Sequence, residues 1–185
     1  MCHQASSTVQ YNTECDEAQA WARSKVHMAM AQISALTCVR FEPAQTFNTD
    51  FLAITSAEDG CWSYVGKIGG RQALNLGNGC ISAPVAVHEI IHALGFGHEQ
   101  SRPDRDKYIS FKDEATALNY DKDTVFFVTG FPYDFASAMH YGANGEMFPR
   151  DPAVKSLGAG PNSKNTLLSG IDAAKINTLY GCDCP

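Results

Sequence analysis

The sequence predicts a two-lobed α+β domain, and three observations support this prediction. Segments with the period of β-strands are gathered in the first half of the chain, beside two segments with the apolar spacing of long helices. Residues 130–170 are rich in glycine and proline, which is typical of irregular structure. Residues 171–180 have the pattern of a last helix. We therefore expect one domain, 1–185, with a twisted mixed sheet and both long helices in its N-terminal lobe (1–98) and a mostly irregular C-terminal lobe (99–185).

The first predicted elements are a strand and a long helix. Residues 8–13 alternate apolar and polar side chains as a short strand does. Residues 15–17 then open a helix, because acidic side chains are favoured in a first turn by the helix dipole. Its buried face is predicted from apolar residues at helical spacing, Ala18, Ala22, Val26, Ala29, Ile33 and Leu36. Trp21, Met28 and Met30 are interpreted as packing residues too.

The next segments predict the rest of the sheet. Residues 38–42 form a strand that Pro43 ends, and residues 51–55 form another. Trp62, Tyr64 and Val65 alternate along a further strand. The glycine pair at 69 and 70 indicates a hairpin turn that leads into a strand at 72–76.

The second long helix is predicted with both of its ends. Ser82 suits the N-cap and Pro84 the first turn, and the helix would run to about Leu94. After this helix the pattern weakens, apart from a possible short helix at 112–120. The C-terminal helix at 171–180 has Ser169 or Asp172 near its start and Gly181 after its last turn.

Composition and charge narrow the classes of function. The 185 residues are 44% hydrophobic and 18% charged, as in a globular protein. A net charge of −6, without clustered Lys or Arg, argues against a nucleic-acid partner. No apolar run approaches the ~20 residues that span a bilayer, so we expect no membrane span.

Three histidines within eleven residues predict a metal site. His88 and His92 lie four residues apart, so they project from one face of the second helix, with Glu89 beside them. Gly95 can end the helix and let the chain return His98 to the same ion. Three neutral nitrogens leave one position open, as in catalytic rather than structural zinc sites. Two histidines and a glutamate also occur on ordinary helix surfaces, but the third histidine favours the metal.

These residues follow the H-E-x-x-H-x-x-G-x-x-H pattern of the metzincin class of zinc peptidases. That class has a second signature, a tight turn with a methionine, and residues 137–141 (S-A-M-H-Y) supply it. Residues 95–106, 61–66 and 35–41 are also similar to segments of the astacin family. The sequence thus resembles astacins from about its first helix to Cys182. The resemblance implies a two-lobed metzincin-like fold and a zinc endopeptidase activity.

The resemblance also implies the roles of the site residues. One zinc ion per chain would be held by His88, His92, His98 and Tyr141. Glu89 would be the general base, which takes a proton from the zinc-activated water and passes it to the leaving amine. Tyr141 would leave the metal to stabilise the tetrahedral intermediate. The alternative for Tyr141 is an ordinary core tyrosine with a hydrogen-bonded tip.

Residues around the site have supporting roles in the same interpretation. Met139 would pack beneath the metal without binding it, and His140 would make a supporting hydrogen bond. In the family, the residue matching Glu99 is linked through water to the amino terminus released by activation, and residues 1–7 differ from the usual mature start. A structural ion-pair cluster is expected rather than substrate contacts for Arg102, Asp104, Arg105 and Asp106.

Seven cysteines indicate an oxidising compartment. The astacin pattern implies the disulfides Cys61–Cys80 and Cys38–Cys182. The odd count leaves a free thiol or a missing partner among Cys2, Cys15 and Cys184. Residues 1–7 lack the features of a signal peptide although the cysteines indicate an oxidising compartment, so we expect that a signal and a pro-segment were removed or left out. The resemblance supports this expectation, because astacins are typically secreted zymogens whose inhibitory pro-segment blocks the zinc.

The leading hypothesis is a secreted zinc endopeptidase that cuts protein or peptide substrates. One alternative is a secreted binding module that retains the peptidase fold without turnover, and another is a hydrolase of a non-protein amide. The pocket after the scissile bond is expected to be lined by residues from 141–157. Arg150 or Lys155 could there favour an acidic substrate residue, although solvated surface charge is the simpler account of both.

Overall fold

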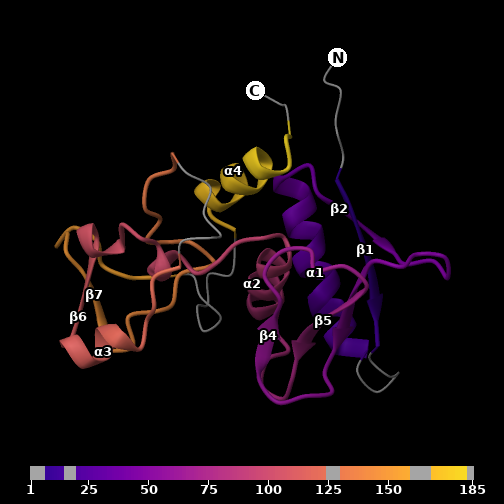
Figure 1. Cartoon of the computed structure of the whole chain (residues 1–185), viewed down its shortest axis with the longest axis horizontal. Coiled ribbons are helices and arrows are strands. Elements are labelled where there is room, and N and C mark those ends of the chain that lie inside the picture. The colour runs from indigo at the N-terminus through magenta and orange to yellow at the C-terminus, as the bar shows by residue number, and fades with distance from the viewer. Residues whose placement is uncertain (1–6, 15–19, 124–129, 159–167, 183–185) are drawn as a thin grey trace.

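The computed structural model describes residues 7–14, 20–123, 130–158 and 168–182. Its two longest helices, α1 (Ala20–Leu36) and α2 (Ala83–Ala93), lie with the main sheet on one side of the molecule (Figure 1). The sheet is formed by β1 (Thr8–Thr13), β2 (Arg40–Pro43), β3 (Phe51–Thr55), β4 (Cys61–Ser63) and β5 (Arg71–Leu76). Among the described residues, no helix has the length and apolar character needed to cross a membrane.

The main sheet is mixed, as predicted. Its strand order is β2-β1-β3-β5-β4, and every pairing is parallel except that of β4, which runs antiparallel to β5 at the edge. The predicted strand at 38–42 is shifted, because β2 begins at Arg40 and includes Pro43. A proline is tolerated there because β2 is the other edge strand.

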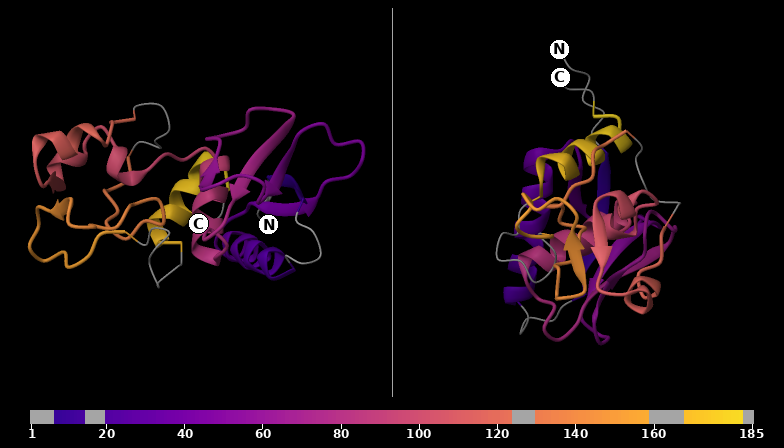
Figure 2. Two further views of the ribbon diagram at one scale, coloured as in Figure 1. Left: turned by 90° about the horizontal axis from the view of Figure 1, so that it is seen from below. Right: turned by 90° about the vertical axis from the view of Figure 1, so that its left-hand side faces the viewer.

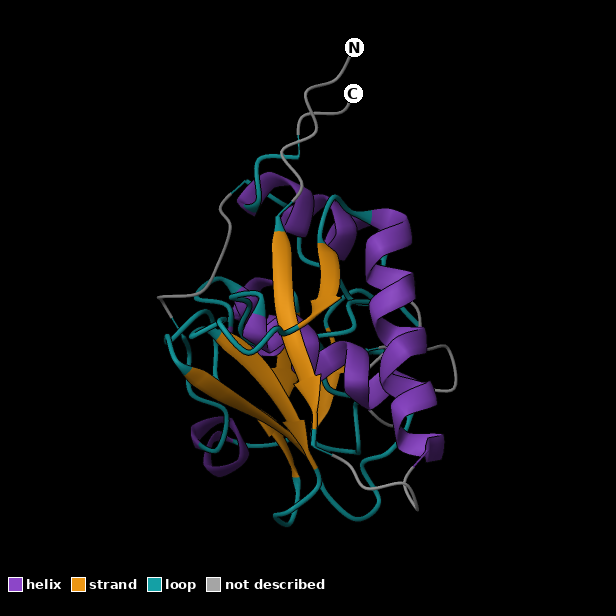
Figure 3. Ribbon diagram, turned by 90° about the vertical axis from the view of Figure 1, so that its right-hand side faces the viewer, coloured by secondary structure: helices purple, strands orange, loops and turns teal. Residues whose placement is uncertain are grey.

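Helix α1 lies along one face of the sheet (Figure 3). Its predicted face is buried at Ala22, Val26, Ala29 and Ile33, and Met30 is buried as well. Two expectations for this helix are wrong. Leu36 is 47% exposed because the helix ends there and Val39 enters the core instead. Met28 is 54% exposed, since it lies two positions after Val26 and therefore on nearly the opposite face. The predicted opening of the helix, 15–17, lies outside the described residues.

Helix α2 has the predicted ends. The Ser82 hydroxyl accepts a hydrogen bond from the Val85 amide, Pro84 lies in the first turn and Leu94 is the C-cap. Gly95 follows with φ of 107°, which a residue with a side chain rarely adopts. The helix is buried from Val85 to His92, so the histidines stand on a rigid element.

The other side of the molecule has more regular structure than expected. It contains the short 3-10 helices η2 (Glu99–Ser101) and η3 (Arg105–Lys107), the strands β6 (Ile109–Phe111) and β7 (Met147–Pro149), and α3 (Glu114–Leu118). β7 pairs antiparallel with β6, which corrects our expectation that 130–170 holds no regular structure. A second apolar cluster stabilises this pairing through Ile109, Tyr133, Met147 and Leu157. α3 is shorter than the predicted helix at 112–120.

Helix α4 (Gly170–Leu179) lies between α1 and the rest of the C-terminal half of the chain (Figures 1 and 2). A capping box formed by Ser169 and Asp172 begins it. Ala173 and Ile176 belong to the main apolar cluster, which also contains Met139 and residues of both long helices. The C-terminal half therefore contributes to the core of the first half, and the lobe boundary at residue 98 stays a prediction.

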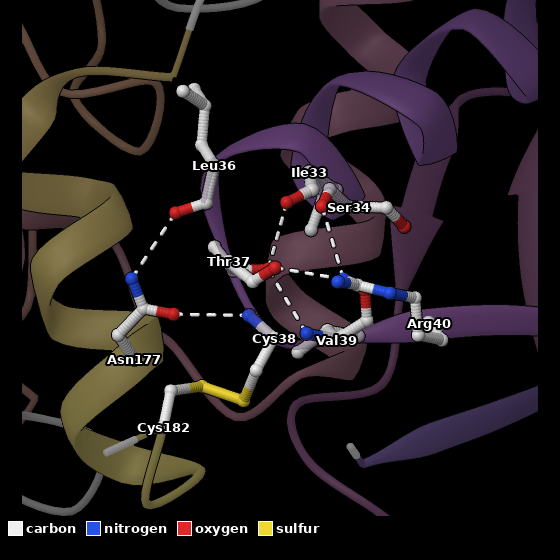
Figure 4. Close-up of a disulfide and its surroundings, with 9 residues drawn as sticks. All are labelled: Ile33, Ser34, Leu36, Thr37, Cys38, Val39, Arg40, Asn177 and Cys182. Carbon is white, nitrogen blue, oxygen red and sulfur yellow. Dashed lines mark hydrogen bonds between the residues drawn. A yellow bond between two sulfur atoms is a disulfide. The ribbon is translucent and has the colours of Figure 1, made fainter. Parts of the chain in front are cut away.

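Among the described residues two disulfides are present, in the pairs that the resemblance implied. Cys61–Cys80 joins β4 to the segment before α2, and Cys38–Cys182 joins the end of α1 to the end of α4 (Figure 4). Beside the second bridge, the Asn177 side chain accepts a hydrogen bond from the Cys38 amide and donates one to the Leu36 carbonyl, both at 3.1 Å. The remaining cysteines lie outside the described residues.

Candidate metal and catalytic site

Two of the three predicted histidine ligands are fixed by backbone carbonyls. His88 donates its Nδ1 hydrogen to the Ala138 carbonyl oxygen, and His92 donates its own to the Phe96 carbonyl oxygen, each at 2.8 Å. These bonds assign the tautomer of both rings, because a carbonyl oxygen can only accept. Each Nε2 atom is therefore left with a lone pair, the form in which imidazole binds a metal.

The third histidine meets these lone pairs. Nε2 of His98 lies 3.1 Å from Nε2 of His88 and 3.2 Å from Nε2 of His92, and the three ligand atoms lie within 4.8 Å of one another. Tetrahedral nitrogen ligands at zinc distances are about 3.3 Å apart, so the spacing fits this ion. A proton on the His98 nitrogen could satisfy only one of its two neighbours, whereas one cation satisfies all three. The histidines could thus hold a zinc ion.

Burial keeps these imidazoles neutral. It lowers the pKa of His88 to about 4, with a smaller contribution from the charge of His92. Burial, followed by the charges of His92, His88 and His140, lowers the pKa of His98 to about 2, and burial also lowers the pKa of His92. At neutral pH all three are therefore unprotonated, as metal ligands must be.

Glu89 follows the first ligand and is 4% exposed. Its Oε2 atom has no hydrogen-bond partner among the residues that the structure describes. Burial raises the pKa of this carboxyl to about 7. Burial of a carboxyl oxygen without a partner lowers stability, so its presence indicates a function. A proton acceptor beside a metal-activated water is a function that fits.

The predicted Tyr141 reaches the same site from the C-terminal half. Its ring centre is 4.5 Å from that of His98 and 6.2 Å from that of His88. The backbone amide of Tyr141 donates to Oε1 of the buried Gln100 at 3.0 Å. Burial, and then the charge of Glu89, raises the pKa of the Tyr141 phenol.

The methionine turn adjoins the site through the Ala138 carbonyl that His88 contacts. Met139 is buried in the main apolar cluster, and its carbonyl oxygen accepts a hydrogen bond from the Glu99 amide at 2.9 Å. His140 is fully buried; its Nδ1 donates to the Tyr141 carbonyl oxygen at 2.7 Å, so its Nε2 accepts from the Tyr133 hydroxyl at 2.8 Å. The hydrogen bonding expected of His140 is therefore present.

The predicted ion-pair cluster is also present. Arg102 contacts Glu99 and Asp104, and Arg105 contacts Asp106. Sequence reasoning missed the second cation at Glu99, the buried Lys175 of α4. It also missed Gln100 and the carbonyl acceptors of the histidines, because no local pattern marks a contact between distant segments.

The site opens into a cleft of about 700 Å³. It is lined by parts of β4 and α2, residues 97, 98, 100 and 101, residues 119–123 and Tyr141. Of the segment 141–157, which we expected to line the substrate pocket, Tyr141 borders this cleft. Arg150 instead donates to the carbonyl oxygens of Asp106 and Ile109, at 2.7 and 3.1 Å, and Lys155 donates to the carbonyl oxygen of Pro152.

Comparison with known proteins identifies one family. A family model described as Astacin, a peptidase family, matches residues 3–181. Zinc metalloproteinase nas-15 of Caenorhabditis elegans is 37% identical over 88% of this chain and 29% of its own length. The astacin-like metalloendopeptidase of Gallus gallus is 39% identical over 85% of this chain and 40% of its own length. The chain spans between 29% and 54% of the length of eight curated relatives that it matches.

A solved structure has the same fold. High choriolytic enzyme 1, a hatching enzyme zinc-protease from Oryzias latipes, superimposes with a TM-score of 0.80 at 32% identity. The match covers 95% of this chain and 90% of that chain.

Proposed function

Because the chain belongs to the astacin family of zinc metalloendopeptidases, we propose that it is the catalytic domain of a secreted enzyme that hydrolyses internal peptide bonds of proteins. The proposal rests on one observation above all. Three Nε2 atoms converge at 3.1 and 3.2 Å, two of them with lone pairs fixed by carbonyl acceptors, beside a buried Glu89 oxygen without a partner among the described residues.

In this proposal His88, His92 and His98 hold the zinc ion, with Tyr141 as a further ligand. When bound, zinc supplies a water whose pKa is about 7 and polarises the scissile carbonyl. Glu89 accepts the proton of the attacking water and delivers it to the amine that leaves, which amide hydrolysis requires because an unprotonated amide nitrogen is a poor leaving group. Although Glu89 is buried, it is among the residues that line the cleft, which supports contact with a bound substrate.

Tyr141 would also act on the transition state. Its ring centre lies 4.5 Å from that of His98 and the residue lines the cleft, which supports a place for its hydroxyl beside the substrate carbonyl. There the phenol, which burial keeps protonated, would donate a hydrogen bond to the developing oxyanion.

Secretion and a precursor form belong to the same proposal. Two disulfides favour an oxidising compartment, because such bridges are rare in reducing ones. An inhibitory pro-segment in the precursor would cover the cleft until it is cleaved. The substrates are proteins or peptides, bound in extended form across the cleft.

The test compares cleavage of denatured casein by this chain and by Glu89→Ala and Glu89→Gln, each with and without a zinc chelator. We expect the unaltered chain to cut, the chelator to stop it and zinc to restore it. Both variants should bind zinc and cut at least about 1000-fold more slowly, because the proton acceptor is lost.

Other outcomes would favour the alternatives. A folded chain that binds one zinc ion and cuts neither casein nor a peptide mixture would support the non-catalytic binding module. Cleavage of small amides without cleavage of any peptide would support the non-protein amide hydrolase.

A further inference from the structure

A buried ion pair connects the C-terminal helix to the metal site. Nζ of Lys175 in α4 lies 2.6 Å from Oε2 of Glu99, and the two side chains are 7% and 3% exposed. Glu99 directly follows His98 in the sequence, whereas Lys175 is 76 residues further on than Glu99. The pair therefore holds the segment that contains His98 against α4, which is distant from it in the sequence.

The Glu99 carboxylate joins three segments at once. Its Oε1 accepts hydrogen bonds from the Asp134 amide at 2.9 Å and from the Arg102 guanidinium at 3.0 Å, while Oε2 is held by Lys175. The Glu99 amide donates to the Met139 carbonyl oxygen. A buried carboxylate that loses one of its cations tends to move toward water or toward its remaining partners, because an uncompensated buried charge is costly.

Helix α4 is itself anchored at both ends. At its start, the Asp172 carboxylate accepts from the Ser137 hydroxyl at 2.6 Å and from the Ala138 amide at 2.8 Å. At its end, Cys182 is bonded to Cys38, and Asn177 bridges to the end of α1 (Figure 4). Lys175 therefore lies on a helix that is tied to the methionine turn at its start and to the end of α1 at its end.

We propose that Lys175 is a positioning residue for the metal site: it holds Glu99, and through Glu99 it fixes the approach of His98 to the zinc ion. The inference rests on the proposed function, because it assumes that the three histidines bind zinc. It adds a residue from the far end of the chain that contacts neither metal nor substrate. Replacing Lys175 should therefore change the zinc affinity and the geometry of the ligands more directly than it changes turnover.

The test measures zinc affinity by competition with a chromophoric chelator, and ligand geometry from the visible spectrum of the cobalt-loaded protein. Lys175→Met is compared with Lys112→Met, which makes the same chemical change at an exposed position. We expect Lys175→Met to weaken zinc binding by about 10-fold, the lower end of the cost of losing a direct partner of a metal ligand, because Lys175 acts on His98 only through Glu99, and to alter the cobalt spectrum. Lys112→Met should change neither.

A double variant separates positioning from a general loss of fold. Lys175→Met combined with Glu99→Gln removes both charges of the buried pair. The double variant should therefore fold, and its loss of zinc affinity should be smaller than the sum of the losses in the two single variants. Circular dichroism and the urea midpoint report the fold of each variant. Additive losses in the double variant would overturn the inference.

The failure of this inference differs from the failure of the proposed function. If the unaltered chain binds zinc and Lys175→Met binds it equally well with the same cobalt spectrum, the positioning role is wrong and the enzyme proposal stands. If the unaltered chain binds no zinc, both are wrong.

Discussion

His88 donates its Nδ1 hydrogen to the carbonyl oxygen of Ala138 at 2.8 Å. The first metal ligand is thereby joined to the methionine turn, fifty positions further along the chain. That turn is held in its own right, because the Asp172 carboxylate accepts from the Ser137 hydroxyl and the Ala138 amide. The orientation of His88 thus depends on a carboxylate that touches neither the ring nor the cleft.

Asp172→Ala should therefore destabilise the fold and weaken zinc binding together. The change leaves the Ala138 amide and the Ser137 hydroxyl without their buried acceptor and removes half of the capping box of α4. We expect the free energy of unfolding to fall by about 2 kcal/mol or more, which urea denaturation measures.

Asp172→Asn is the matched variant, since the amide oxygen can still accept one of these bonds. Its losses should be smaller than those of Asp172→Ala in both measurements. If Asp172→Ala were as stable as the unaltered chain, the turn would not depend on α4.

Gly95→Ala should disturb His98 through the backbone. Gly95 has φ of 107°, and a β-carbon there would also lie 3.5 Å from Cδ2 of Leu179. We expect a loss of about 1 to 3 kcal/mol of stability and weaker zinc binding, because the chain must turn here to return His98 to the other histidines. Gly170→Ala is the control: its β-carbon would meet nothing within 4 Å and its φ is ordinary, so stability should be nearly unchanged.

The elements that sequence alone predicted are those whose signals are local. α2 carries its N-cap, its first-turn proline, its apolar faces and its terminating glycine within residues 82–95, and the structure agrees at both ends. β1 and β3 have the predicted bounds. Leu36 was predicted wrongly because apolar periodicity does not show where a helix leaves the core.

The contacts that sequence could not predict are long-range. β6 and β7 are three residues each, too short to show a period, and they are strands only because they pair with each other. The Lys175–Glu99 ion pair and the Ala138 acceptor of His88 likewise join segments that are distant in the chain. The motif therefore predicted which side chains meet, but not what holds them.

Tyr141→Phe should lower kcat more than it changes KM or zinc affinity. If the hydroxyl stabilises the oxyanion mainly in the transition state, we expect kcat to fall about 100- to 1000-fold, measured with a quenched fluorescent peptide. Tyr120→Phe is the control from the same cleft. Its hydroxyl already donates to Glu146 at 2.6 Å, and this bond raises the pKa of Tyr120 to about 12. Equal effects of both changes would contradict a specific role for Tyr141.

The two disulfides should differ in their effect on the metal site. Replacing Cys38 and Cys182 together by serine opens a loop with a sequence separation of 144, whereas replacing Cys61 and Cys80 opens one of 19. Chain-entropy arguments predict losses of about 5 and about 3 kcal/mol respectively. The first pair also fixes the end of α4, so its loss frees Lys175 and should weaken zinc binding in conditions where the protein remains folded. The second pair fixes β4 at the rim of the cleft and should leave zinc affinity unchanged while raising KM.

If both changes weakened zinc binding in proportion to the stability lost, the metal site would respond to global stability, and α4 would have no particular link to it.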